Sequence, residues 1–154
     1  MLNLNKNILI KKFNEYEYLQ GFDTDDNPIF MKGYEGLKAL YGNENAEITS
    51  SNFGEMSGVY NPYFKKYCLF TVSTGSVDMY LSDRIYGPYD EKIHLYTQAD
   101  EVCPISSTTN APIKSAYAPM VHEKMLYNNG KKMYMITSSW IPCYNPSIYE
   151  VKFK

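Results

Sequence analysis

Cysteine is scarce in this sequence, and the few cysteines are badly placed for structural chemistry. The 154 residues contain three, Cys68, Cys103 and Cys143, which cannot all pair within the chain, and none forms a C-x-x-C motif. A disulfide framework is therefore not expected, and reduced or incidental thiols are the simpler interpretation. The chain also has two histidines, and its cysteines and histidines do not have the spacing of a zinc site. We therefore expect no metal.

Long apolar runs and an excess of charge of either sign are also missing. The longest apolar run near the start, Ile8–Ile10, is far shorter than a membrane-spanning helix and lacks the core and cleavage site of a signal peptide. Fifteen basic residues stand against seventeen acidic ones, a formal net charge of -2, without the concentrated basic face that nucleic-acid backbones require. The sequence thus predicts no membrane insertion and no nucleic-acid binding, and it leaves the compartment undetermined.

The common nucleotide-binding and hydrolytic motifs are absent as well. The chain has no P-loop, no G-x-G-x-x-G, no H-E-x-x-H and no G-x-S-x-G, so the chemistry that these motifs carry is not indicated. The segment Asp23–Asn27 has the acidic composition of a calcium loop but lacks its glycine and closing glutamate. A hairpin turn is therefore the better interpretation of this segment, and no cofactor is expected.

Tyrosine, by contrast, is abundant, with 16 residues, and short segments that alternate between apolar and polar residues recur along the chain. Tyr and Phe favour strands. The strand-like segments are Glu15–Leu19, Pro28–Met31, Tyr67–Val72, Val77–Ser82, Ile93–Tyr96, Met133–Ile136 and Ile148–Phe153. Helical periodicity is limited to a single turn around Gly36–Tyr41. The sequence therefore predicts an all-β, antiparallel protein.

The chain also contains an internal repeat. Lys65–Ser73 aligns with Lys131–Ser139, 66 residues later, and an aromatic residue and a polar turn precede each copy. The first copy belongs to a unit of four expected strands, at about Gly54–Tyr60, Lys66–Ser73, Val77–Ser82 and Lys92–Thr97. Repeated four-stranded antiparallel units are typical of β-propeller blades. A chance match within an ordinary β-sandwich remains the alternative, because two copies are few.

We therefore predict a single partial β-propeller domain over residues 1–154, with about two and a half blades. Residues 15–32 are a half blade, residues 54–97 a full blade and residues 117–153 a three-stranded closing blade. Closed propellers need at least about four blades, and an open arc exposes sheet edges. The prediction therefore calls for a partner that closes the ring, through self-association or an N-terminal propeller half.

Three groups of residues resemble the domain-of-unknown-function 4185 family. Gly54–Ser57 followed by Tyr60–Pro62 is similar to its G-E-x-S … Y/W-N segment, and Ser82–Tyr89 is similar to its S-x-x-x-x-G-P-W turn, with Tyr89 in place of Trp. Its closing pattern, Y-x-P … H … S-x-W … Y-N, is matched by Tyr117–Pro119, His122, Ser138–Trp140 and Tyr144–Asn145. The match spans roughly residues 15–153 and corresponds to the C-terminal half of a family domain. The resemblance implies a five-bladed propeller acting on polysaccharide, and some family members look like endo-D-arabinanases.

Glu55 is the candidate catalytic residue. It opens an expected innermost strand directly after Gly54, which lets the backbone approach closely and allows the carboxylate to point into an axial funnel. Glycoside hydrolysis needs a proton donor and a second carboxylate, about 5–5.5 Å away for retention or about 6.5–9.5 Å for inversion. Asp78 is a candidate for the second, although a middle strand usually lies away from the axis. The alternative for Glu55 is a structural role, as an acceptor for backbone N–H groups at a strand start.

The expected sugar-binding residues surround Glu55 in the proposed blade arrangement: Trp140, His122, Tyr117, Asn145, Tyr144 and Arg84. Trp140 is suited to stack on a sugar ring, and His122 to bond a hydroxyl group. A blade-core Trp, a structural His and a solvated Asp83–Arg84 turn are the alternatives. Together with these residues, the family resemblance implies the C-terminal part of a carbohydrate-active β-propeller, glycoside hydrolase-like, acting on a polysaccharide such as arabinan. A noncatalytic carbohydrate-binding or scaffold propeller fragment is the second hypothesis.

Overall fold

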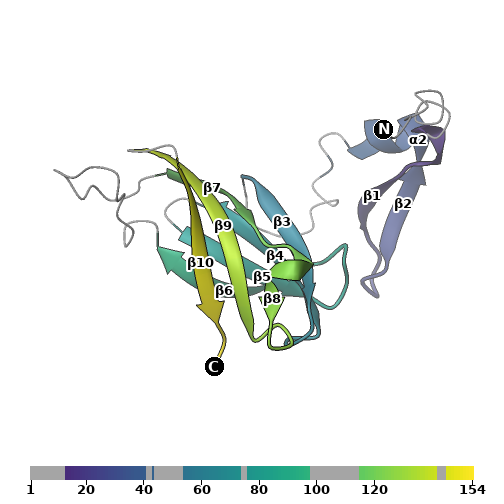
Figure 1. Cartoon of the computed structure of the whole chain (residues 1–154). Helices are drawn as coiled ribbons and strands as arrows, with labels where there is room; N and C mark the ends of the chain where they lie inside the picture. Colours follow the sequence, from purple (N-terminus) through teal and green to yellow (C-terminus); the bar gives the residue numbers. More distant parts are fainter. Residues whose placement is uncertain (1–12, 41–42, 44–53, 74–75, 98–114, 142–144) are drawn as a thin grey trace, which may run out of the picture. The chain divides into compact units, whose positions relative to one another are not determined.

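The computed structural model describes residues 13–40, 43, 54–73, 76–97, 115–141 and 145–154. The chain divides into two compact units, Met1–Ile48 and Thr49–Lys154. Antiparallel strands dominate both units, which confirms the predicted all-β class (Figure 1).

The first unit consists of a β-hairpin and a short helix. A 3-10 turn at Phe13–Glu15 precedes β1 (Glu17–Phe22), which pairs with β2 (Pro28–Lys32). The predicted turn at Asp23–Asn27 joins them, because the Asp23 carboxylate accepts hydrogen bonds from the backbone N–H groups of Asp25 (2.9 Å) and Asn27 (2.8 Å).

Helix α2 (Gly33–Leu40) follows the hairpin directly and runs for 8 residues, longer than the single turn that the sequence predicts. Gly36 lets it approach β2, since a Cβ atom at this position would lie 2.2 Å from the Met31 carbonyl oxygen. Among the described residues, no helix has the length and apolar character needed to cross a membrane.

Four strands in chain order form the first sheet of the second unit, which we call sheet 1. They are β3 (Met56–Asn61), β4 (Lys66–Ser73), β5 (Ser76–Ser82) and β6 (Glu91–Thr97), each antiparallel to the next. All four strands expected between residues 54 and 97 are present, with ends within two residues of the predicted ones.

Sheet 2 contains β7 (Ser115–Met120), β8 (Leu126–Tyr127), β9 (Lys132–Ile141) and β10 (Asn145–Lys152), in the order β10-β9-β7. The short strand β8 also pairs with β9, near its start, while β7 pairs near its end. The 3-10 helix η4 (Glu123–Met125) separates β7 from β8. The single first strand that the sequence predicts here is therefore divided into two pieces.

The internal repeat corresponds to a structural repeat. In sheet 1, Asn61 pairs with Lys66 across a four-residue turn, and in sheet 2 Tyr127 pairs with Lys132 across a turn of the same length. The two hairpins are 66 residues apart, the same spacing that aligns the sequences. The alignment therefore identifies equivalent positions in the two sheets.

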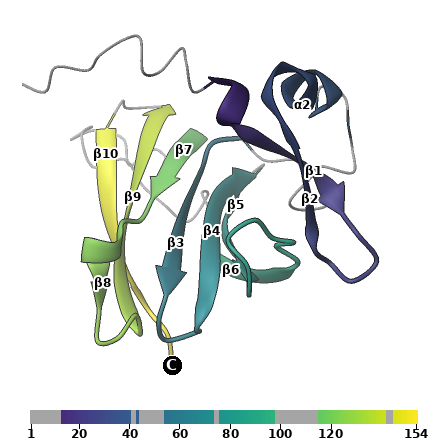
Figure 2. The same cartoon turned by 90° about the vertical axis from the view of Figure 1, so that its right-hand side faces the viewer.

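The two sheets pack face to face and share one apolar core (Figure 2). Sheet 1 contributes Cys68, Phe70, Val77, Met79 and Leu81, sheet 2 contributes Met133 and Met135, and Val121 joins them from the segment just after β7. Their first strands lie close together, since the Ser57 hydroxyl of β3 accepts a hydrogen bond from the Val121 N–H, just after β7. Their last strands also meet, since Tyr96 of β6 stacks on Tyr149 of β10 with ring centroids 5.0 Å apart.

The faces that meet in this core are not equivalent in the repeat. Phe70 of sheet 1 corresponds to Ile136 of sheet 2, yet Phe70 is in the core and Ile136 is not. Met135, which is in the core, corresponds to Leu69, which lies on the other face of sheet 1. Sheet 2 thus packs against sheet 1 through the opposite face of the repeated unit. Such head-to-tail packing is expected of units that follow one another around an axis.

A buried amide joins the two equivalent hairpins. Asn61 is fully buried, and its side chain donates to the Gly130 carbonyl (3.1 Å) and accepts from the Tyr63 N–H (2.9 Å). Gly130 has φ +82, and a Cβ atom there would lie 2.0 Å from Asn61 Oδ1. Only glycine fits this position without displacing the amide.

We predict that Gly130→Ala lowers the free energy of unfolding by about 2–3 kcal/mol, because it combines a left-handed φ with a collision at a buried amide. Urea denaturation followed by circular dichroism measures the change. Gly58→Ala is the matched control, because its Cβ would meet only the Cys68 carbonyl at an ordinary 3.7 Å. Equal stabilities of the two variants would contradict this account of the hairpin contact.

Candidate functional site

Glu55 lies where the first strands of the two sheets meet, a place we call the seam. It directly precedes β3, is exposed, and its Oε2 atom accepts a hydrogen bond from the Ala118 N–H of β7 (3.0 Å). Ala118 has φ +50 and lies at a register shift between Tyr117 and Met120. The irregular backbone thus leaves an N–H group that the β7–β9 ladder does not use, and the carboxylate satisfies it.

Two more of the predicted site residues lie at the seam. Tyr117 is half-buried and precedes Ala118 in β7. His122 is exposed and follows Val121, whose N–H bonds to Ser57. Glu55 thus precedes β3, Tyr117 lies in β7 and His122 follows β7, and a sugar-binding role for these residues stays a prediction.

His122 also has a local structural role, because it caps η4. Its Nδ1 atom accepts a hydrogen bond from the Lys124 N–H (3.2 Å). A neutral imidazole that accepts at Nδ1 carries its proton at Nε2. The ring can therefore offer an N–H donor at its exposed end.

Three other predicted residues are only partly covered by the structure. Trp140 lies in β9, and Asn145 is the first residue of β10. Asn145 pairs with Ser139 of β9, and Ser139 also pairs with Ala116 of β7. Their backbones thus lie at the end of sheet 2 where β7 begins. The side chains of Trp140 and Asn145, and the whole of Tyr144, lie outside the described residues.

Arg84 lies apart from this group. It follows β5, and its backbone N–H donates to the Ser82 hydroxyl (3.1 Å). Ser82 pairs with Tyr67 of β4, and Tyr67 pairs with Tyr60 of β3. Ser82 therefore lies near the last residues of β3, whereas Glu55 precedes the first residue of this strand. Since β3 contains 6 residues at about 3.3 Å each, the length of this strand separates Arg84 from Glu55. A single sugar unit at the seam does not reach it.

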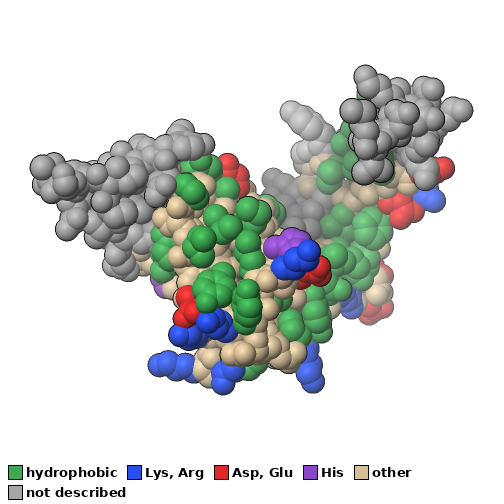
Figure 3. All heavy atoms as spheres, in the orientation of Figure 1, with side chains coloured by type: hydrophobic (Ala, Val, Ile, Leu, Met, Phe, Trp, Pro, Cys, Tyr) green, Lys and Arg blue, Asp and Glu red, His purple; other side chains and the backbone are tan. Residues whose placement is uncertain are grey.

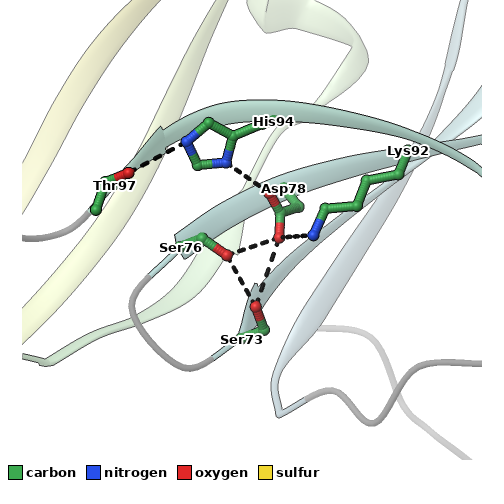
Figure 4. A network of polar contacts seen from close by, with 6 residues as sticks. All are labelled: Ser73, Ser76, Asp78, Lys92, His94 and Thr97. Atoms are coloured by element: carbon green, nitrogen blue, oxygen red, sulfur yellow. Dashed lines mark hydrogen bonds and ion pairs between the residues drawn. The ribbon is translucent and has the colours of Figure 1, made fainter.

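Sheet 1 contains a network of polar contacts around Asp78, which sequence reasoning treated as a weak candidate (Figure 4). Its side chain is fully buried, and its carboxylate oxygens lie 2.9 Å from Lys92 Nζ, 2.9 Å from His94 Nδ1 and 2.7 Å from the Ser76 hydroxyl oxygen. His94 Nε2 in turn lies 3.2 Å from the Thr97 hydroxyl. The network links the β4–β5 turn to the edge strand β6.

Hydrogen bonding decides the ionisation of Asp78. Burial raises the pKa of its carboxyl group, but the hydrogen bonds from Lys92, His94 and Ser76 outweigh burial and hold the pKa below its usual range. The same contact with Asp78 raises the pKa of Lys92. Asp78 therefore stays ionised at neutral pH and is committed to its partners, so it is poorly suited to serve as a general acid or base.

Asp78 and Glu55 also point to different sides of sheet 1. Asp78 pairs with Thr71, and both alternate with the core residues Phe70 and Met79, so they lie on the face directed away from sheet 2. Glu55, by contrast, bonds to sheet 2. The structure does not bring these two carboxylates together.

The Asp78 network had a detectable signal in the sequence. Lys92 and His94 are two residues apart in an alternating segment, a spacing that places both side chains on one face of a strand. The partner on the neighbouring strand was not predictable, because a register shift between Val77 and Asp78 sets which residues face one another.

Metal and thiol chemistry find no support in the part of the chain that the structure covers. No group of three or more His, Cys, Asp and Glu side chains within the described ranges has the arrangement of a metal site. Cys68 is a free thiol in the core, and burial raises its pKa to about 12, which keeps it protonated. Cys103 and Cys143 lie outside the described residues.

Comparisons with known proteins show a similarity of fold. No protein-family model and no curated protein matches the chain. The fold is similar to the crystal structure of a "putative hydrolase" from Bacteroides ovatus ATCC 8483, with a TM-score of 0.60 and 17% identity. The similarity covers 87% of this chain and 35% of the other, so this chain spans about a third of that protein's length. At this level of identity, the comparison shows a shared fold.

We predict that Asp78→Asn lowers the free energy of unfolding at pH 7 by about 1–3 kcal/mol, because Lys92 and His94 lose their charged partner. The folded pKa of Asp78 lies below its unfolded value of about 3.9. The stabilisation is therefore present above that unfolded value and is lost as the pH falls through the folded pKa. Urea denaturation between pH 7 and pH 2 measures the difference between the two proteins.

The control for this prediction is Asp83→Asn, which removes a carboxylate that is 78% exposed and 3.3 Å from Lys66. Its effect should be small, since exposed ion pairs contribute about 0–1 kcal/mol. A difference between wild type and Asp78→Asn that stays constant down to pH 2 would show that the charge of Asp78 does not stabilise the fold.

Proposed function

We propose that this chain is part of a carbohydrate-active, hydrolase-like protein whose sugar site lies at the seam between β3 and β7. The observation that carries the proposal is the hydrogen bond from the Ala118 N–H to Glu55 Oε2 (3.0 Å), which holds an exposed carboxylate against β7, the strand that contains Tyr117. A carboxyl group positioned in this way has one oxygen engaged and the other available to transfer a proton. Proton donation to the leaving oxygen is the first requirement of glycoside hydrolysis.

Two predicted site residues in or just after β7 suit a sugar ligand. Tyr117 provides an aromatic ring, which packs against the apolar C–H face of a sugar ring. His122 provides a donor at Nε2, because its Nδ1 atom accepts from the Lys124 N–H. Polysaccharide, and arabinan in particular, is the substrate class that the family resemblance implies.

The packing of the two sheets supports a propeller-like arrangement. Consecutive copies of the repeat meet through opposite faces, as blades around an axis do. Their first strands, β3 and β7, lie side by side and would face that axis. We propose on this basis that sheets 1 and 2 are consecutive blades, with Glu55 at the axial side.

A noncatalytic carbohydrate-binding role is the second candidate. Glycoside hydrolysis needs two carboxylates, and Asp78 is committed to Lys92 and His94 on the other face of sheet 1. Glu55 itself serves as an acceptor for a backbone N–H. A site with one carboxylate is able to bind sugar hydroxyl groups without breaking a glycosidic bond.

We predict that Glu55→Gln reduces the hydrolysis of arabinan by about 10²–10⁴-fold, the usual contribution of a general acid. The amide oxygen of Gln can still accept from the Ala118 N–H, so the fold should be preserved. Reducing-end release from a panel of polysaccharides measures turnover, and glycan-array binding measures affinity. Glu35→Gln, a change to an exposed residue of α2, is the control.

The outcomes separate the two candidates. Hydrolysis that depends on Glu55 supports the enzyme, whereas sugar binding without turnover supports the binding module. Hydrolysis that Glu55→Gln leaves intact would remove Glu55 from the catalytic role, and the absence of both binding and turnover would overturn the carbohydrate proposal.

A further inference from the structure

A bulge in β6 brings the side chains of His94 and Thr97 to the same face of sheet 1. Residues three apart in a regular strand point to opposite faces. The register of β6 shifts between the partners of Val77 and Asp78, so Leu95 is the extra residue of a bulge. As a result, His94 Nε2 and the Thr97 hydroxyl oxygen lie 3.2 Å apart (Figure 4). Bulges often re-aim side chains in this way beside active sites.

Asp78 decides which nitrogen of His94 carries the proton. Its Oδ1 atom lies 2.9 Å from His94 Nδ1, and an ionised carboxylate can only accept a hydrogen bond. The Nδ1 atom is therefore the donor, which leaves Nε2 of the neutral ring as an acceptor. The hydroxyl group of Thr97 thus donates its hydrogen bond to Nε2. A carboxylate, an imidazole and a hydroxyl group connected in this order form the arrangement that activates a nucleophile.

The three groups are buried to different degrees, as such chemistry requires. The Asp78 side chain is 0% exposed, whereas the His94 side chain is 51% exposed and Thr97 is half-buried. The carboxylate is thus shielded from water, which strengthens its effect on the imidazole ring. Lys92 and Ser76 bond to the other carboxylate oxygen, Oδ2, and hold the group without occupying Oδ1. The imidazole and the hydroxyl group remain within reach of a ligand from solution.

A carboxylate of sheet 2, Glu150, offers a comparison. Figure 3 shows hydrophobic side chains gathered over β9 and β10, the strand that contains Glu150. The partners of this carboxylate are Lys132 (2.6 Å), Lys152 and the Tyr134 hydroxyl group (2.8 Å). Lysine and tyrosine carry their own protons at neutral pH, so none of these partners can take the proton of a nucleophile. The imidazole therefore distinguishes the Asp78 network chemically.

We propose that Thr97, His94 and Asp78 form a hydrolytic site for carboxylic esters, separate from the seam. Thr97 is the nucleophile and His94 the general base, whereas Asp78 is a positioning residue that orients the ring and stabilises the imidazolium. An ester suits this site, because a secondary hydroxyl group is a weak nucleophile and an alkoxide leaves more readily than an amine. The proposal does not depend on the sugar site, since Asp78 and Glu55 point to different sides of sheet 1.

The reaction takes place in two steps. The Thr97 oxygen forms a bond to the ester carbonyl carbon while its proton passes to His94 Nε2. The same proton goes to the alkoxide as the carbon–oxygen bond of the ester breaks, which releases the alcohol and leaves the acyl group on Thr97. Water then attacks the acyl carbon and gives a proton to His94. This proton returns to the Thr97 oxygen as its bond to the acyl group breaks, which releases the carboxylic acid.

Labelling of the full chain with a fluorophosphonate tests the nucleophile. The Thr97 oxygen should form a bond to phosphorus as its proton passes to His94 and fluoride leaves. Intact-mass measurement should show one adduct per chain, and peptide mapping should locate it on Thr97. Thr97→Val and His94→Gln should take up no label, whereas Thr97→Ser should retain labelling. Thr24→Val is the matched control, since Thr24 is an exposed threonine of the Asp23–Asn27 turn, and it should label as wild type does.

Turnover of nitrophenyl acetate gives a second readout. His94→Gln should lower the rate by about 10²–10⁴-fold, the usual contribution of a general base. Asp78→Asn should still take up one label per chain but about a hundredfold more slowly, because an amide does not stabilise the imidazolium. A merely structural role of Asp78 would instead lower the final amount of label, and circular dichroism should show that all variants are folded.

Three results would overturn the proposal. The first is wild-type protein that takes up no label, which would leave the Asp78 network with a structural role alone. The second is an adduct on a residue other than Thr97. The third is ester turnover that Thr97→Val leaves as fast as in the Thr24→Val control.

Discussion

The second unit of this protein depends on one apolar contact, the burial of the Phe70–Met79 face of sheet 1 under Met133 and Met135 of sheet 2. Each of these four side chains is 0% exposed, and burial of side chains of this size stabilises a fold by about 1.5–3 kcal/mol each. This contact brings β3 beside β7, and the polar links at the seam follow from it. Glu55 has a defined position because the core beneath it is closed.

The repeat explains which faces of the two sheets are buried against each other and which faces are not. Two copies of one unit that meet through opposite faces always leave one face of each kind at the two ends of the array. In sheet 1 the remaining face is buried and polar in part, with Asp78 held by Lys92 and His94. In sheet 2 the remaining face is apolar and exposed at Ile148.

Much of the fold was predictable from the sequence. The alternation of apolar and polar residues indicates strands, and the internal repeat indicates two equivalent sheets. The strands of sheet 1 and both equivalent hairpins agree with the sequence analysis. The division of the first strand of sheet 2 was not predictable, because it depends on η4 and on the capping bond from the Lys124 N–H to His122. At the candidate site, the hydrogen bond of Glu55 was not predictable, because it depends on the φ of one residue, Ala118. The Asp78 network required the register of β6, which a single sequence does not contain.

Nuclear Overhauser contacts from methionine methyl groups report whether the two repeated sheets meet through opposite faces. If they do, the methyl groups of Met133 and Met135 should contact the side chains of Phe70 and Met79, and not those of Leu69 or Tyr80. Contacts from Ile136 to Phe70 would instead indicate packing through equivalent faces, as in a symmetric sandwich. That result would contradict the account, and the seam at Glu55 would lose its basis.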